Sequence, residues 1–242
     1  MVLLVVDAQN GIVDERLYEF RKFVGNIKKL IGSAREQGIE VIYVQHDDGP
    51  DTGFSIGDDE FEVYSEFQPM PDEKRFIKSV CSAFKKESGL LEYLTAKEEK
   101  DVMICGIMTD FCINATVEAG FEHGLHMIVP AYANSTQDNE YMTREQAYHY
   151  YNEFLWPERY ADCVPMDRAY KNPLMEHYEC DGQISLFDYE EQTQKTDRPE
   201  NVDESGCPGQ ISMFDYWDET LKYNETKDDC DGQINMFMYL DK

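Results

Sequence analysis

The sequence lacks long apolar runs, paired cysteines and an excess of positive charge, and each absence excludes a class of protein. The opening apolar run Val2–Val6 ends at Asp7, and no stretch reaches the roughly 20 apolar residues of a membrane span. The run is also too short, and lacks the basic start, for a signal peptide, so a cytoplasmic protein without membrane contact is expected. The seven cysteines are odd in number, which favours reduced thiols over a disulfide framework.

Positive charge is scarce. The chain has 22 Lys and Arg but 49 Asp and Glu, which gives a formal net charge of -27. Such a surface repels phosphate backbones and anionic lipids, so direct nucleic-acid binding is not expected. Hydrophobic residues nevertheless make up 42% of the chain and aromatic residues 13%, which is enough for a folded core.

Residues 1–170 alternate strand-like and helix-like segments. Short apolar runs predict buried strands at 2–6, 39–44, 102–105 and 126–130. Apolar residues at helical spacing predict helices over 15–37, 90–96, 112–123 and 143–154, the last with Thr143 as N-cap. This alternation predicts an α/β class, a three-layer Rossmann-like fold with a mostly parallel sheet flanked by helices. Residues 46–72 are expected to form a long loop above the sheet, where such folds bind ligands.

Two short segments place a carboxylate and an amine where catalysis could use them. A strand ends in Asp7-Ala8-Gln9, and Lys78 shortly precedes Ser82-Ala83-Phe84. In isolation, Asp7 is more simply a turn cap and Lys78 a solvated surface lysine.

A third segment places a thiol at the start of a predicted helix. There a buried strand reaches Gly106, a turn follows through Thr109, and Cys112 begins the helix. Free N–H groups at a helix start should lower the pKa of the Cys112 thiol and could hold a developing oxyanion. The other cysteines of this region, Cys81, Cys105 and Cys163, are expected to be structural.

Together and in this order, the three segments resemble the isochorismatase-like cysteine hydrolases, which include nicotinamidases, N-carbamoylsarcosine amidohydrolases and ureidoacrylate amidohydrolases. The resemblance spans about residues 1–170. It implies a homo-oligomeric enzyme that cleaves a C–N bond, amide or carbamoyl, of a small molecule through a thioester. Cys112 would be the nucleophile, Asp7 the group that accepts and returns its proton, and Lys78 the partner of Asp7. A cis peptide between Ile107 and Met108 is also implied, with the N–H groups of Met108 and Cys112 as oxyanion hole.

One departure from the family concerns metal. Nicotinamidases of the superfamily carry Asp-x-His after the second strand, as part of a metal site. Here the corresponding residues are His46-Asp47-Asp48, and that order is missing. The sequence therefore predicts no metal, no cofactor and a substrate other than nicotinamide. His46 and Asp47 could contact a metal or substrate, but a loop-capping role is the preferred interpretation.

Residues 171–242 differ in composition, with 18 acidic and 6 basic residues. They are expected to form a largely disordered acidic tail with three copies of Cys-x-Gly-Gln-Ile-x-Leu/Met-Phe-x-Tyr. The copies resemble the peptide by which bacterial proteins dock on the sliding clamp. The matching anchors are Gln183, Leu186, Phe187, Gln210, Met213, Phe214, Gln233, Met236 and Phe237.

Two further interpretations of the repeats compete with clamp binding. The apolar patches could pack on the hydrolase body or on a neighbouring subunit as a strap. Zinc binding by the repeat cysteines is disfavoured, because the paired Cys-x-x-Cys spacing is missing. The alternative function is thus an interaction protein whose tail recruits a partner such as a sliding clamp.

Overall fold

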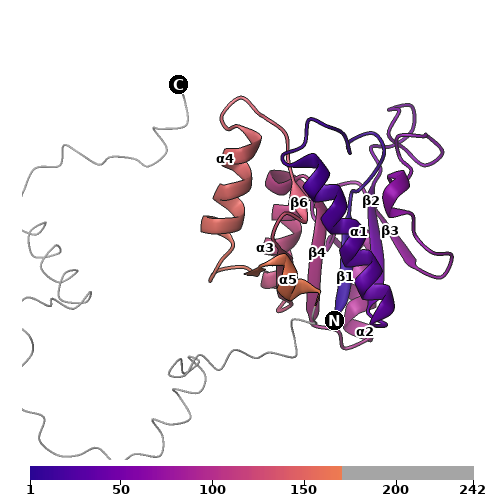
Figure 1. Cartoon of the computed structure of the whole chain (residues 1–242). Coiled ribbons are helices and arrows are strands. Elements are labelled where there is room, and N and C mark those ends of the chain that lie inside the picture. The colour runs from indigo at the N-terminus through magenta and orange to yellow at the C-terminus, as the bar shows by residue number, and fades with distance from the viewer. Residues whose placement is uncertain (171–242) are drawn as a thin grey trace, which may run out of the picture. The chain divides into compact units, whose positions relative to one another are not determined.

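The computed structural model describes residues 1–170 (Figure 1). The predictions for residues 171–242, namely the acidic tail, its three repeats and their partner, lie outside the described residues. Within residues 1–170, none of the helices is long and apolar enough to cross a membrane. The strands are β1 (Val2–Val6), β2 (Glu40–His46), β3 (Lys74–Lys78), β4 (Asp101–Ile107), β5 (His126–Pro130), β6 (Asn134–Ser135) and β7 (Asp162–Val164). The helices are α1 (Phe20–Glu36), α2 (Leu90–Ala96), α3 (Asn114–Glu122), α4 (Arg144–His149) and α5 (Met166–Ala169).

The strands form one seven-stranded sheet in the order β3-β2-β1-β4-β5-β7, with β6 paired to β4. Every pairing between these strands is parallel. The predicted α/β fold with a mostly parallel sheet is therefore confirmed. Because parallel strands all end at one edge, the residues that follow β1, β2, β3 and β4 meet there.

Side chains of β1 alternate between two cores, one on each face of the sheet. Leu3 and Val5 pack into the core covered by α1, whereas Val2, Leu4 and Val6 face the core covered by α2 and α3. All five are at most 1% exposed. Burial on both faces explains why the strand is a continuous apolar run, and Figure 1 shows the sheet between its helices.

The first helix begins later than its apolar spacing predicts. It starts at Phe20 instead of residue 15. The Tyr18 N–H donates to the Thr136 carbonyl oxygen, and Glu19 has a left-handed backbone with φ 49°. A tertiary contact thus draws the chain away from the helix before Phe20, and periodicity alone does not register such a contact.

Two predicted helices contain a segment of π-helix. Thr109–Ile113 is π-helical and leads into α3, so Cys112 lies in this turn, ahead of the α-helix. Tyr150–Leu155 is π-helical and continues α4. The predicted N-cap at Thr143 is confirmed, because its side chain accepts from the Gln146 N–H in a capping box.

Three strands were not predicted. β3 lies at the edge of the sheet and carries charge at Lys74 and Arg75, both exposed, so it lacks an apolar run. β6 and β7 have only two and three residues, too few to show periodicity.

Candidate active site

The structure brings Asp7, Lys78 and Cys112 together at the carboxyl edge of the sheet. Asp7 follows β1, Lys78 is the last residue of β3, and Cys112 lies in the π-helical turn after β4. The Lys78 Nζ lies 2.7 Å from Asp7 Oδ2 and 3.3 Å from Cys112 Sγ. Lys78 is 3% exposed, so it is not the solvated lysine that its sequence context alone would suggest. These contacts are close enough for the predicted roles of nucleophile, proton acceptor and charge partner, which stay predictions.

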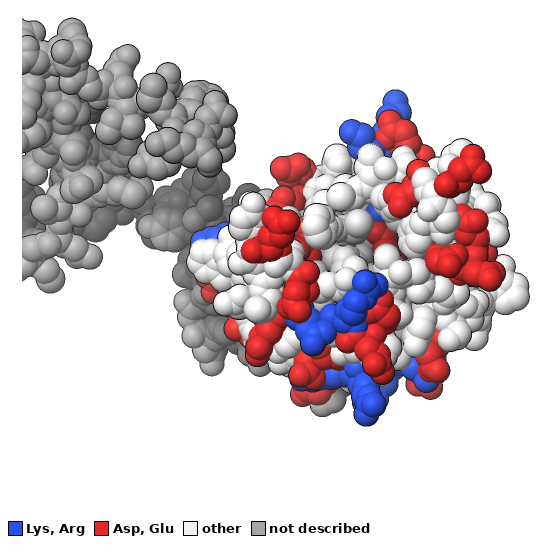
Figure 2. Space-filling view, turned by 90° about the horizontal axis from the view of Figure 1, so that it is seen from above, with Lys and Arg blue, Asp and Glu red and all other residues white. Residues whose placement is uncertain are grey.

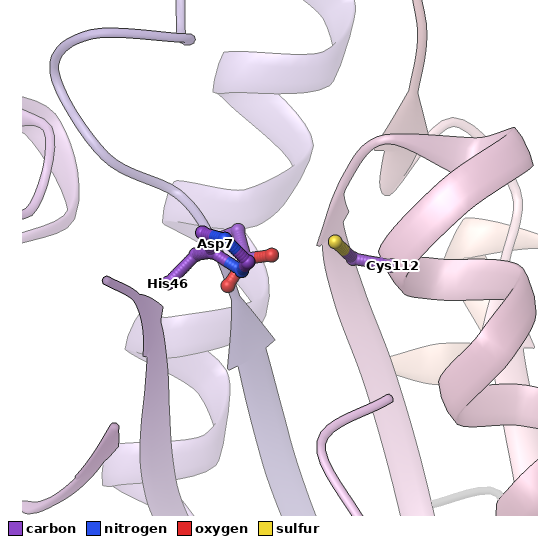
Figure 3. A group of neighbouring side chains, drawn as sticks. All are labelled: Asp7, His46 and Cys112. Atoms are coloured by element: carbon purple, nitrogen blue, oxygen red, sulfur yellow. The ribbon is translucent and has the colours of Figure 1, made fainter. Parts of the chain in front are cut away.

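The Asp7 carboxylate faces the sulfur. Figure 3 shows one of its oxygens turned toward Cys112. Among residues 1–170, Asp7 Oδ1 has no partner that meets hydrogen-bond geometry. Ligand atoms of Asp7 and Cys112 nevertheless lie within 4.8 Å of each other, and the neighbouring thiol acts to lower the pKa of Asp7. This is the contact through which a proton can pass from sulfur to carboxylate.

Backbone geometry explains two of the motif residues. Asp7 has a left-handed backbone with φ 50°, which Asp tolerates better than most residues. Gly106 has φ 131°, and a Cβ there would lie 1.9 Å from the carbonyl oxygen of Val6. Only glycine lets β4 approach β1 this closely while the chain turns toward Cys112.

Hydrogen bonds join the motif segments into one unit. The Thr116 hydroxyl donates to the Cys112 carbonyl oxygen at 2.6 Å and accepts from the Ala83 N–H at 3.0 Å. The buried Thr109 hydroxyl donates to Asn134 Oδ1 at 2.7 Å. The turn carrying the sulfur is therefore fixed to both the Ser-Ala-Phe segment and β6.

Burial is the main influence on the pKa values of Asp7 and Cys112. It raises the pKa of Asp7, and the Lys78 ammonium opposes that rise. Burial also raises the pKa of the Cys112 thiol, and the Asp7 carboxylate raises it further. The prediction of a lowered thiol pKa was therefore wrong, because desolvation and a neighbouring negative charge outweigh the helix start. A thiol with a raised pKa would need a base before it could act as a nucleophile.

The peptide between Ile107 and Met108 is cis, as the family resemblance implies. Met108 directly follows β4, and Cys112 lies four residues further along the same turn. The role of the Met108 and Cys112 N–H groups as an oxyanion hole stays a prediction.

His46 belongs to the site, although sequence reasoning preferred a loop-capping role for it. It ends β2 and is paired in register with Lys78, and its Nδ1 lies 3.2 Å from Lys78 Nζ. Asp47 does cap the loop, because its Oδ1 accepts from the Gly49 N–H and the Ser55 hydroxyl. The signal that could have revealed His46 is its position at the end of a buried strand, next to the predicted base.

The ammonium of Lys78 bears on whether this site fits a metal. Ligand atoms of Asp7, His46 and Cys112 lie within 4.8 Å of one another, as a metal ion would require (Figure 3). The Lys78 Nζ, however, contacts all three groups at 2.7, 3.2 and 3.3 Å. A second cation would have to displace a buried ammonium, so the arrangement does not fit a metal ion.

The other cysteines of the described region differ in exposure. Cys105 is buried within β4, and burial raises the pKa of its thiol, as expected of an inert core residue. Cys163 is half-buried. Cys81 is exposed after β3, and its assignment as a structural cysteine stays a prediction.

The loop after β2 makes one side of the site acidic. Residues 46–64 contain seven Asp and Glu and no Lys or Arg. Hydrogen bonds from the Gln9 amide to the Phe61 and His46 carbonyl oxygens attach this loop to the end of β1. Figure 2 looks onto this edge and shows a hollow among mainly uncharged atoms, with carboxylates around it. An anion approaching the site would meet repulsion.

The chain is similar in sequence to curated bacterial proteins. The chain is 28% identical over 138 residues to a streptothricin hydrolase of Streptomyces noursei, covering 56% of this chain and 50% of that protein. It is 33% identical over 117 residues to the isochorismatase family protein YrdC of Bacillus subtilis (strain 168), covering 47% of this chain and 62% of that one. The chain thus spans about half to three-fifths of the length of these curated relatives.

A solved structure and a family model agree with these relatives. The N-carbamoylsarcosine amidase of Thermoplasma acidophilum superposes with a TM-score of 0.57 at 25% identity, covering 69% of this chain and 96% of that one. The Isochorismatase domain model matches residues 1–157. The chain belongs to the isochorismatase family of hydrolases.

Proposed function

We propose that this protein is a cysteine hydrolase that cleaves a C–N bond, amide or carbamoyl, of a small molecule through a thioester at Cys112. The observation that carries the proposal is the buried Lys78 ammonium, which contacts both the Asp7 carboxylate and the Cys112 sulfur. A buried charge pair that touches a thiol suits proton transfer better than it suits stability.

The first half of the reaction acylates the sulfur. Asp7 takes the thiol proton as Cys112 Sγ bonds to the carbonyl carbon, and the carbonyl oxygen becomes an oxyanion. The raised pKa of Asp7 makes it a stronger base than a solvated carboxylate. The C–N bond then breaks while the protonated Asp7 returns its proton to the leaving nitrogen. Ammonia or an amine leaves, and a thioester remains on Cys112.

The second half releases the acid. Asp7, again a carboxylate, accepts a proton from water as the water oxygen bonds to the thioester carbon. The C–S bond breaks, and the proton on Asp7 returns to the sulfur to restore the thiol. Lys78 stays beside Asp7 in both halves and offsets its charge whenever the carboxylate is ionised.

The relatives and the charge around the site narrow the substrate. Similarity to an N-carbamoylsarcosine amidase supports a C–N bond as the target. The acidic loop over residues 46–64 favours a neutral or cationic amide over an anionic one.

The test is a screen of small amides and ureido compounds for release of ammonia, run in the presence of EDTA. Cys112→Ala should abolish turnover of any substrate found. Cys81→Ala is the matched control, because that exposed thiol lies outside the ammonium cluster, and it should retain full activity. Turnover by Cys112→Ala would contradict the thioester mechanism.

A further inference from the structure

The Lys78 ammonium has more acceptors than hydrogens. Its Nζ lies 2.7 Å from Asp7 Oδ2, 3.0 Å from the Val80 carbonyl oxygen, 3.2 Å from His46 Nδ1 and 3.3 Å from Cys112 Sγ. An ammonium carries three N–H donors. The two short contacts, to Asp7 and Val80, take two of them. One hydrogen therefore remains for two acceptors at nearly equal distance, His46 Nδ1 and Cys112 Sγ.

The surroundings of His46 fix which of its nitrogens can accept. An ammonium only donates, so Nδ1 must present its lone pair to Lys78. The proton then resides on Nε2, which lies 2.9 Å from Asp48 Oδ1 and donates to it. Gln9 holds the backbone of His46 from both sides, because its Oε1 accepts from the His46 N–H at 2.7 Å and its Nε2 donates to the His46 carbonyl oxygen at 3.0 Å.

We propose that His46 is a positioning residue that competes with Cys112 for the third hydrogen of Lys78. In the resting enzyme the His46 lone pair holds part of that hydrogen bond, so the sulfur is kept as a thiol. When negative charge reaches the sulfur, the hydrogen turns from His46 to Sγ, because a hydrogen bond between two ions is stronger than one to a neutral nitrogen. The role of this exchange in turnover rests on the proposed function, whereas the hydrogen bonding itself does not.

Two substitutions of His46 separate the role of Nδ1 as acceptor from the role of Nε2 as donor. In His46→Asn the amide oxygen can take the place of Nδ1, which preserves the acceptor for Lys78. In His46→Gln the amide can reach the position of Nε2 and Asp48, but nothing accepts where Nδ1 was. His123→Asn is the control, because His123 is exposed at the end of α3.

The assay is the rate of Cys112 alkylation by iodoacetamide from pH 6 to 10, followed by peptide mass in a Cys81→Ser background. Among residues 1–170, the charged and titratable groups around the sulfur are Asp7 after β1, His46 at the end of β2 and Lys78 at the end of β3. Release of one hydrogen bond to the sulfur should make His46→Gln react about tenfold faster at neutral pH. The same factor should hold at every pH of the series, and the Asn and His123 variants should follow the parent. An unchanged or slower Gln variant would overturn the inference.

The tautomer of His46 gives a second test, which is measured on the wild-type protein. A two-bond ¹⁵N–¹H correlation spectrum of the full chain should show His46 protonated at Nε2 alone, with the signal assigned by its loss in His46→Asn. Protonation at Nδ1 would overturn the inference. Neither measurement uses a substrate, so failure of the ammonia screen and failure of this inference are distinguishable.

Discussion

Replacing Lys78 by Met should strongly destabilise the protein, because the Asp7 carboxylate would remain buried without its counter-charge. The two side chains are joined at 2.7 Å and each is 1% exposed. Removing one partner of such a buried pair costs about 3–5 kcal/mol. Met has similar length and flexibility, so the substitution removes the charge with little change in packing.

The loss should grow with pH. Burial raises the pKa of Asp7 and Lys78 opposes that rise, so the variant should have an Asp7 pKa that is higher still. A carboxyl whose pKa is higher in the folded than in the unfolded state contributes stability below its unfolded value, and this is lost as pH rises through the folded value. The variant should therefore lose about 1.4 kcal/mol per pH unit across that window.

Urea unfolding followed by circular dichroism at pH 5 and pH 8 measures this loss. The gap between wild type and Lys78→Met should be larger at pH 8. Adding Asp7→Asn removes the second charge, so the double variant should recover most of the stability while staying inactive. Equal stability of Lys78→Met and wild type at pH 8 would refute the account of a buried, ionised Asp7.

Three further predictions test other parts of the molecule. Gly106→Ala should prevent stable folding, since its Cβ would lie 1.9 Å from a carbonyl oxygen of β1; urea unfolding beside Gly25→Ala, whose Cβ meets nothing within 4 Å, checks this. Hydrogen bonds to Asp162 and Asp101 raise the pKa of His126 from 6.5 to about 9. Its stabilisation should be full below about pH 6.5 and lost as pH rises through about 9. Because the side chain is 45% exposed, His126→Gln should cost only about 1 kcal/mol at pH 6, and the difference in unfolding free energy from wild type should vanish by about pH 10. The full chain should bind a bacterial sliding clamp in a pull-down, and a variant with Ala at all three repeat phenylalanines should not; unfolding of that variant would instead identify the repeats as a packing strap.

Local sequence patterns were sufficient to predict the bounds of those helices and strands whose burial follows a simple pattern along the chain. β1 and β5 are buried runs, and α2 has its apolar residues on one face, so their predicted bounds match the structure. The contact among Asp7, Lys78 and Cys112 was predicted from the order of the three motifs. Each residue by itself favoured a structural or surface role.

The features that the sequence did not predict depend on contacts between segments that are distant in the chain. β3 carries charges because it is an edge strand, and only its register with β2 places His46 beside Lys78. The direction of the Cys112 pKa was predicted wrongly because the helix start is visible in the sequence, whereas the burial of the sulfur beside Asp7 is a tertiary property. The neighbours and the burial of these side chains are known only when the strands have been placed next to one another.

The central claim is that Asp7 accepts the proton of the Cys112 thiol during the reaction, and turnover without that carboxylate tests it most directly. Iodoacetamide at pH 7, followed by peptide mass, should modify Cys112 well before Cys105, whose burial leaves it without a base. In Asp7→Asn no carboxylate accepts the thiol proton, so ammonia release from a substrate found in the amide screen should fall to the level of Cys112→Ala. Equal alkylation rates for the two cysteines in the wild-type protein, or ammonia release by Asp7→Asn that matches the wild type, would contradict the account.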